Sequence, residues 1–447
     1  MELETILLVY ILIPLLLIHL FTTSHYFKDV PDLYLAEQSE IDATRHVNES
    51  PIYRSNKLEM GLRVGLGIRY DSYKLRAGNL RDIWSVKSLQ FGDEVVINDI
   101  RFKWAEINYM VDKISKQLKG VKVVRIPLEH RIDIKWVIVL IAGFINQITV
   151  EFYDVGEGEG ANIDDIDTTG EGELYEYKNQ YSSEKDKGIS LRIVRHNQGA
   201  IEKSTIEFTQ LNIVCAVAST IKHLPASQEI GKDDTMVIVP SKNISNEELL
   251  NVITKFLTCL VTHAKLVIAG NPDDITKYNP TILSIHEDNL PTPQANYLSY
   301  INKAIISRGK LLPGQLRIIY INNRITSCKY TAKQLSHLRG IYSARIIRES
   351  GYYNIIGPLI LTDFYDYRTF AKFSYGCISQ SVEMKIVATN EQNIGLLSVR
   401  GYVIGKTTNI MKDKHHNSNS STMHENEGFM PVNVRCKWGS DGCLYVI

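Results

Sequence analysis

The sequence has no excess of charge of either sign, since its 447 residues include 50 Lys and Arg and 50 Asp and Glu. Nucleic acid is bound through a basic surface, so we expect no nucleic-acid partner. With 44% hydrophobic and 22% charged residues, the chain is neither poor in apolar residues nor apolar throughout. This composition excludes a disordered protein and a multispanning channel, and the length allows two or three domains or one large α/β body.

Cysteine is also scarce. The six cysteines form no CxxC pair and have no Cys/His spacing typical of a zinc site; they are Cys215, Cys259, Cys328, Cys377, Cys436 and Cys443. We therefore expect reduced thiols, mostly buried, with neither a metal nor another cofactor.

Long hydrophobic runs are absent except at the N-terminus. Residues 5–23, TILLVYILIPLLLIHLFTT, carry no formal charge and are interrupted only by Pro14 and His19. At about 1.5 Å per residue, a helix of this length just crosses a hydrocarbon core of about 30 Å. No Lys or Arg precedes the run, so a cleaved signal peptide is the weaker interpretation. We expect an anchor over residues 1–24 that contacts the lipid bilayer through residues 5–23.

The flanking charges predict the orientation of this anchor. Lys28, Arg45 and Arg54 follow the apolar run, and basic residues favour the cytoplasmic side. A short span suits a thin bilayer, which favours the endoplasmic reticulum membrane with a single pass and a cytosolic body. If the segment instead bends at Pro14, insertion into the monolayer of a lipid droplet is the alternative.

The remaining chain alternates between strand and helix patterns. Residues 25–90 give a weak signal and are interpreted as a linker and lead-in segment. From residue 91 to 447, patterns such as VKVVRIPL, IDIKWVIVLIAGFINQ and ITVEFYD predict a parallel α/β sheet, and TIEFTQLNIVCAVASTIKHL predicts a helix over residues 205–224. Beyond Gly376 the pattern becomes rich in strands.

Two polar segments interrupt this domain. Residues 151–176 contain ten Asp and Glu and no Lys or Arg, so we interpret residues 151–187 as a mobile acidic loop. Its acids do not follow the ligand order of an EF-hand. Residues 412–428 are rich in Asn, Ser and His, which favours a low-complexity polar loop over a metal site.

Four segments give the sequence a family resemblance. FKWAEIN at residues 102–108, VEMKIV at 382–387 followed by GLLSVRG at 395–401, and DGCLYVI at 441–447 stand in the order of the corresponding segments of adenylate-forming enzymes. The chain thus resembles the AMP-binding, acyl-CoA synthetase-like superfamily. The resemblance implies an α/β body of stacked mixed sheets with helices and a small β-rich end, here behind the N-terminal anchor.

The same resemblance implies loops that bind the nucleotide, and the residues of this sequence differ from the family's motifs in those loops. The glycine-rich phosphate loop falls on residues 195–204, RHNQGAIEKS, where Asn197, Gly199, Lys203 and Ser204 are its degenerate remnants. The family's aromatic-Gly-x-Thr-Glu motif falls on residues 357–363, which keep only Thr362 and Asp363.

Two further departures concern the end of the chain. The family's ribose-binding Thr-Gly-Asp falls on Val432, Asn433 and Val434, and valine offers no acceptor for hydroxyl groups. The family's C-terminal lid, which carries a catalytic lysine, would follow the DGCLYVI strand, where this sequence ends. We therefore expect a degenerate member without that lid.

A framework that persists while its ligand loops depart is typical of a pseudoenzyme. We expect no catalytic residues and a scaffold or regulatory role in lipid metabolism, with a protein partner. A protein that binds fatty acid or acyl-CoA after losing its nucleotide site is the alternative, and a divergent acyl-CoA ligase is a weaker one.

Overall fold

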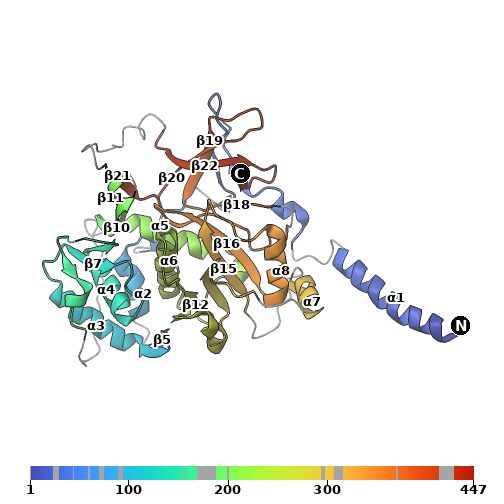
Figure 1. Ribbon diagram of the computed structural model, residues 1–447, viewed down its shortest axis with the longest axis horizontal. Coiled ribbons are helices and arrows are strands. Elements are labelled where there is room, and N and C mark those ends of the chain that lie inside the picture. Colours follow the sequence, from blue (N-terminus) through green and yellow to red (C-terminus); the bar gives the residue numbers. More distant parts are fainter. Residues whose placement is uncertain are drawn as a thin grey trace.

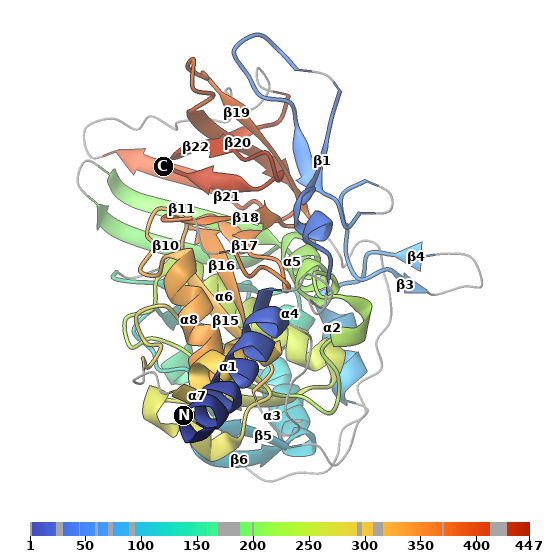
Figure 2. The same cartoon turned by 90° about the vertical axis from the view of Figure 1, so that its right-hand side faces the viewer.

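The structure is a computed structural model that describes residues 2–23, 30–43, 45–58, 61–69, 75–88, 94–156, 158–168, 188–198, 201–292, 297–306, 316–368, 371–411 and 427–447. Two mixed sheets enclose a layer of helices, and further helices cover the outer face of the larger sheet (Figures 1 and 2). A two-stranded hairpin of β3 (Ile68–Arg69) and β4 (Leu75–Arg76) stands apart from both sheets.

The larger sheet has fifteen strands. Six neighbours, from β16 to β5, are parallel, and the other strands pair antiparallel. In spatial order the strands are β1 (Ser39–Ile41), β2 (Tyr53–Ser55), β19 (Val382–Val387), β20 (Gly395–Gly401), β22 (Met430–Trp438), β23 (Leu444–Val446), β18 (Tyr375–Ile378), β17 (Ile355–Leu361), β16 (Arg345–Tyr352), β15 (Ile318–Arg324), β14 (Ile282–His286), β12 (Thr235–Val239), β13 (Lys265–Ile268), β5 (Glu94–Ile97) and β6 (Ile100–Lys103).

The smaller sheet has six strands. Its order is β21 (Lys406–Met411), β11 (Ile201–Thr209), β10 (Ile189–Gln198), β8 (Thr149–Tyr153), β7 (Val123–Pro127) and β9 (Ala161–Asn162). The strands from β10 to β9 run parallel, whereas β11 and β21 pair antiparallel. Because β21 lies between β20 and β22 in the chain, it joins the smaller sheet to the larger one.

Five helices lie between the sheets and build the main apolar core. They are α2 (Leu80–Ser88), α3 (Trp104–Gln117), α4 (Ile134–Ile145), α5 (Gln210–Lys222) and α6 (Asn246–Thr262). On the other face of the larger sheet lie α7 (Tyr297–Ile306) and α8 (Ala332–Tyr342), and Leu335 and Leu338 of α8 close a second core over β12, β14 and β15. Short 3-10 turns occur at η2 (Asp32–Leu35), η3 (Ile163–Asp165), η5 (Ala226–Gln228) and η6 (Pro272–Tyr278).

The helix predicted over residues 205–224 is wrong in its first part. Residues 201–209 form β11, and α5 begins only at Gln210. The side chain of Thr209 accepts a hydrogen bond from Asn212 N, and the side chain of Asn212 accepts one from Thr209 N. This capping box fixes the helix start, and Thr205, Glu207 and Thr209 alternate with Ile206 and Phe208 as a strand requires.

The lead-in segment predicted over residues 25–90 belongs largely to the body. Its β1 and β2 extend the larger sheet through pairing of β2 with β19, and α2 buries Leu80, Ile83 and Trp84 in the main core. Strands of three residues are too short to show a period of two, which is why the sequence pattern missed them.

The two predicted polar loops are described only in part. Within residues 151–187, β9 pairs with β7, and Ile163 and Ile166 are buried, so residues 161–166 are part of the fold. Residues 169–187 lie outside the described residues, as do residues 412–426 of the predicted loop at 412–428.

The N-terminal helix α1 (Glu2–Thr23) projects from the body (Figure 1) and lies in front of it when that side faces the viewer (Figure 2). Its apolar side chains are exposed, with Leu8, Leu15 and Leu17 each 58% accessible. Over the part of the chain that the structure describes, no helix combines the length and hydropathy of a membrane-crossing segment. The predicted anchor therefore stays a prediction.

Candidate functional site

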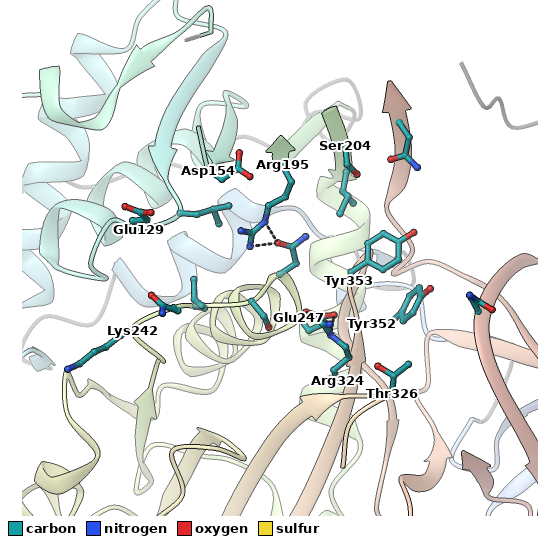
Figure 3. Close-up of a pocket in the computed structure, with 18 residues that line it drawn as sticks. Glu129, Asp154, Arg195, Ser204, Lys242, Glu247, Arg324, Thr326, Tyr352 and Tyr353 are labelled. Carbon is teal, nitrogen blue, oxygen red and sulfur yellow. Dashed lines mark hydrogen bonds and ion pairs between the residues drawn. The ribbon is translucent and has the colours of Figure 1, made fainter. Parts of the chain in front are cut away.

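A cavity of about 750 Å³ opens where the two sheets meet (Figure 3). The carboxyl ends of β7, β8, β12, β15 and β16 point toward it, and side chains from β10, β11, β21 and β22 complete its wall. Ligands of α/β proteins bind preferentially at the carboxyl ends of parallel strands. We therefore take this cavity as the candidate functional site.

The charged side chains of the cavity balance one another. Its acids are Glu129, Asp154 and Glu247, and its bases are Arg195, Lys242 and Arg324. Arg324 Nε lies 2.8 Å from Glu247 Oε1, which holds these two side chains together at the end of β15. The wall therefore offers no excess positive charge to an anion.

Arg195 and Asp154 are held by neighbours in the upper wall of the cavity. Arg195 donates from Nε and Nη2 to Asn246 Oδ1 at 3.0 and 2.8 Å (Figure 3). Its burial lowers the pKa of its guanidinium, although Asp154 and Glu247 oppose the shift. Burial alone would raise the pKa of Asp154, but hydrogen bonds from His196 and from Val155 N together lower it.

The segment predicted in place of a phosphate loop forms a β-hairpin. Arg195 pairs with Ser204, and Gln198 pairs with Ile201, so only residues 199 and 200 lie between β10 and β11. Asn197 lies on β10, and Gly199 lies outside the described residues. Backbone N–H groups engaged in a ladder are not available to surround a phosphate.

Two of the predicted phosphate-loop remnants, Lys203 and Ser204, lie on β11, and only Ser204 lines the cavity. Ser204 lines it together with Ile206. Lys203 alternates with them along the strand and so points to the opposite face of the sheet. The hairpin therefore separates the remaining lysine from the cavity.

Thr362 and Asp363 do not lie in the cavity wall and serve a structural purpose. Thr362 Oγ1 accepts a hydrogen bond from Arg348 N at 2.9 Å. Asp363 is 3% exposed and accepts hydrogen bonds from Lys57 Nζ at 2.7 Å and from Tyr365 N at 2.9 Å. Because Lys57 belongs to the lead-in segment, this ion pair fastens that segment to the body.

Solved structures share this architecture over most of the chain. A luciferase-like enzyme of the mealworm Zophobas morio aligns with a TM-score of 0.55 at 13% identity, over 87% of this chain and 98% of that one. The N-terminal subdomain of NpsA from Klebsiella oxytoca aligns with a TM-score of 0.54 at 12% identity, over 85% and 100%. This protein has the adenylate-forming fold. An o-succinylbenzoate CoA synthetase from Bacillus subtilis gives a TM-score of 0.54 at 12% identity, over 81% and 77%.

Sequence comparison adds a relative but no function. An uncharacterized protein of Saccharomyces cerevisiae, YHR045W, is 23% identical over an alignment of 537 positions, which covers 94% of each chain. No protein-family model matches the sequence. The resemblance predicted from the sequence motifs is thus confirmed at the level of the fold.

Two tyrosines that were not predicted from the sequence line the cavity. The structure places residues 357–361 on β17 rather than at the cavity, whereas Tyr352 and Tyr353 at the end of β16 line it. Their ring centroids are 4.6 Å apart. A Tyr-Tyr pair at the end of the last parallel strand was the signal that could have found them, and the residues that follow it are Asn354, Ile355 and Ile356.

Of the three residues on which the ribose-binding motif falls, the structure brings Asn433 to the cavity. In β22, Val432 and Val434 are buried, and Asn433 between them lines the cavity. The alternation of side chains along the strand therefore presents an amide where valine was expected. An uncharged amide can donate and accept hydrogen bonds, but it supplies no negative charge.

A buried ion pair lies below the cavity. Lys255 on α6 and Glu349 on β16 are 0% and 2% exposed, and their Nζ and Oε1 atoms are 2.6 Å apart. Asn251 Nδ2 donates to the other carboxylate oxygen at 2.9 Å, and Lys255 Nζ lies 3.4 Å from the ring centroid of Tyr320. Burial lowers the pKa of Lys255 even though Glu349 opposes the shift. A small polar cluster thus lies within the apolar layer between α6 and the parallel sheet.

His223 makes this buried cluster sensitive to pH. It accepts from Tyr320 OH at Nε2 (3.1 Å) when Nδ1 donates to Thr220 O (2.6 Å). Burial, and then the charges of Lys255 and Lys57, lower the pKa of His223 well below its usual value. The unfolded chain binds a proton near pH 6.5 and the folded chain does not, so the stability contributed by neutral His223 is present above about pH 6.5 and is lost as the pH falls.

We expect the free energy of unfolding to fall by about 1.4 kcal/mol per pH unit from this residue below pH 6.5. Denaturant titrations between pH 7 and 5 should show a shallower pH dependence for His223→Gln than for the unmodified chain. His337→Gln, at an exposed position on α8, is the matched control. Equal slopes for His223→Gln and the unmodified chain would contradict this prediction.

Proposed function

We propose that this chain is a non-catalytic protein of the adenylate-forming fold that acts as a membrane-attached scaffold or regulatory subunit in lipid metabolism. The observation that carries the proposal is the β10–β11 hairpin, which the chain forms over residues 195–204, where the sequence resemblance predicts the phosphate loop. A triphosphate with its magnesium ion does not fit the cavity wall, because three acids there offset three bases, and Arg195 and Arg324 are engaged by Asn246 and Glu247.

The proposed attachment uses α1. The described leucine and isoleucine side chains of this helix are exposed. Exposure of so much apolar surface is unfavourable in water and favourable in a lipid environment. The basic residues that follow it favour a body on the cytosolic face, in the endoplasmic reticulum membrane or, with insertion bent at Pro14, on a lipid droplet. A protein partner in lipid metabolism completes the proposal.

The absence of adenylation is tested on the purified full chain. We expect no exchange of pyrophosphate into ATP with fatty acids of different length and no ATP-dependent rise in melting temperature. An active adenylate-forming enzyme in the same assay is the positive control. Exchange above the background without protein would refute the non-catalytic proposal and favour a divergent ligase.

A further inference from the structure

The outer helix α7 has an unusual distribution of side chains. A surface helix normally buries its large apolar residues and exposes its polar ones. In α7, Ser299 is 4% exposed, whereas Leu298, Tyr300 and Ile301 are 61%, 64% and 42% exposed. The helix therefore presents Leu298, Tyr300 and Ile301 outward, whereas Ile306 at its end is buried.

The close packing of α7 on α8 explains why the face of α7 that carries Ser299 is buried. Gly340 of α8 lies so close that a Cβ atom at this position would be 2.3 Å from Ser299 O and 3.2 Å from Lys303 Cβ. Only a glycine opposite a small residue permits this approach of the two helices. The contact fixes the rotation of α7 and keeps Leu298 and Ile301, three residues apart, on the side away from α8.

The surroundings of this apolar stripe have the character of an interfacial helix. The Tyr300 ring packs at 6.1 Å from the ring of His337, and Lys303 and Lys333 are exposed on α7 and α8. Apolar side chains in the centre with tyrosine and lysine beside them are typical of helices that lie at the boundary between headgroups and acyl chains.

The position of α1 identifies the surface that covers this stripe. In Figures 1 and 2, α1 projects from the face of the body that α7 and α8 form. The six residues between Thr23 and Val30 span at most about 25 Å when fully extended, so the body stays near the end of α1. A membrane that holds α1 consequently faces α7.

We propose that α7 is a second membrane-contact element, whose Leu298 and Ile301 insert into the headgroup boundary of the bilayer that holds α1. This inference rests on the attachment of α1 proposed above. The contact orients the body, so that the larger sheet stands at a fixed angle to the membrane and the cavity opens away from α7.

The test places a tryptophan on α7 of the full chain. Leu298→Trp and Ile301→Trp are prepared separately and reconstituted into phosphatidylcholine vesicles with and without brominated acyl chains. Val47→Trp is the matched control, because Val47 is 89% exposed in the connection between β1 and β2, and β1 lies well apart from α7 in Figure 2. The emission of the unmodified chain gives the background from its four tryptophans.

We expect brominated lipid to remove most of the added emission at positions 298 and 301 and little at position 47. Flotation of the vesicles reports the attachment of α1 independently. A chain that floats without quenching at either α7 position overturns this inference and leaves the attachment intact, whereas a chain that does not float overturns both.

A second copy of the chain is the other occupant to exclude. If the double variant Leu298→Asp with Ile301→Asp converts a detergent-solubilised dimer into a monomer, α7 is a protein interface and the lipid assignment is wrong. An unchanged size in detergent, together with quenching in vesicles, supports the membrane contact.

Discussion

Replacing Lys255 by methionine is expected to lower the free energy of unfolding by about 3–5 kcal/mol, because it leaves a buried carboxylate without its counter-charge. Glu349 is 2% exposed, and after the substitution only Asn251 would remain hydrogen-bonded to its carboxylate. Denaturant unfolding of the full chain in detergent, followed by circular dichroism, measures the loss. Burial of the charge, rather than the ion pair alone, sets the size of this effect.

Two variants separate these causes. Lys255→Met combined with Glu349→Gln removes both charges, and we expect it to recover a large part of the lost stability. Lys277→Met breaks an ion pair of similar length, 2.6 Å to Asp99, between side chains that are 57% and 48% exposed, and should change stability little. A loss for Lys255→Met no greater than for Lys277→Met would show that the buried charge has no such influence.

Deleting residues 1–24 is expected to move most of the protein from the membrane fraction to the supernatant. The exposed apolar surface of α1 carries the proposed attachment, and the short stripe of α7 buries too few side chains to hold the body alone. Fractionation of cells in low and high salt measures the distribution, and circular dichroism of the released body checks that it is folded.

A substitution tests the same point without shortening the chain. Leu12→Lys with Leu16→Lys places two charges on α1, where both leucines are at least 50% exposed, and should also release the protein. Val155→Lys changes a residue of similar exposure, 63%, on the body and should leave the distribution unchanged. Retention of the truncated protein on membranes in high salt would point to another tether.

The body of the fold could be predicted because its strands are long and its helices are amphipathic or apolar. The pattern VKVVRIPL corresponds to β7 and IDIKWVIVLIAGFINQ contains α4, where Asp133 caps the helix by accepting from Trp136 N. Five of the six cysteines are buried, as expected for thiols in such a core. These elements carry their own periodic signal.

The cavity could be predicted only in part, because its residues come from segments distant in sequence. Tyr352 and Tyr353 line the cavity but were not predicted, because the end of β16 cannot be located from a family motif alone. Lys57 and Asp363 form an ion pair across a separation of 306 residues, which no local pattern contains. The exposure of Asn433 toward the cavity could not be predicted either, because the sequence does not tell which face of β22 is buried.

The pairing of β2 with β19 has a consequence for the order of synthesis. Arg54 pairs with Glu383, so the edge of the larger sheet cannot form until more than 380 residues have been made. At about 5–20 residues per second, the lead-in segment waits for tens of seconds while the central strands complete their own contacts. The first part of the body to leave the ribosome is therefore among the last to reach its final place.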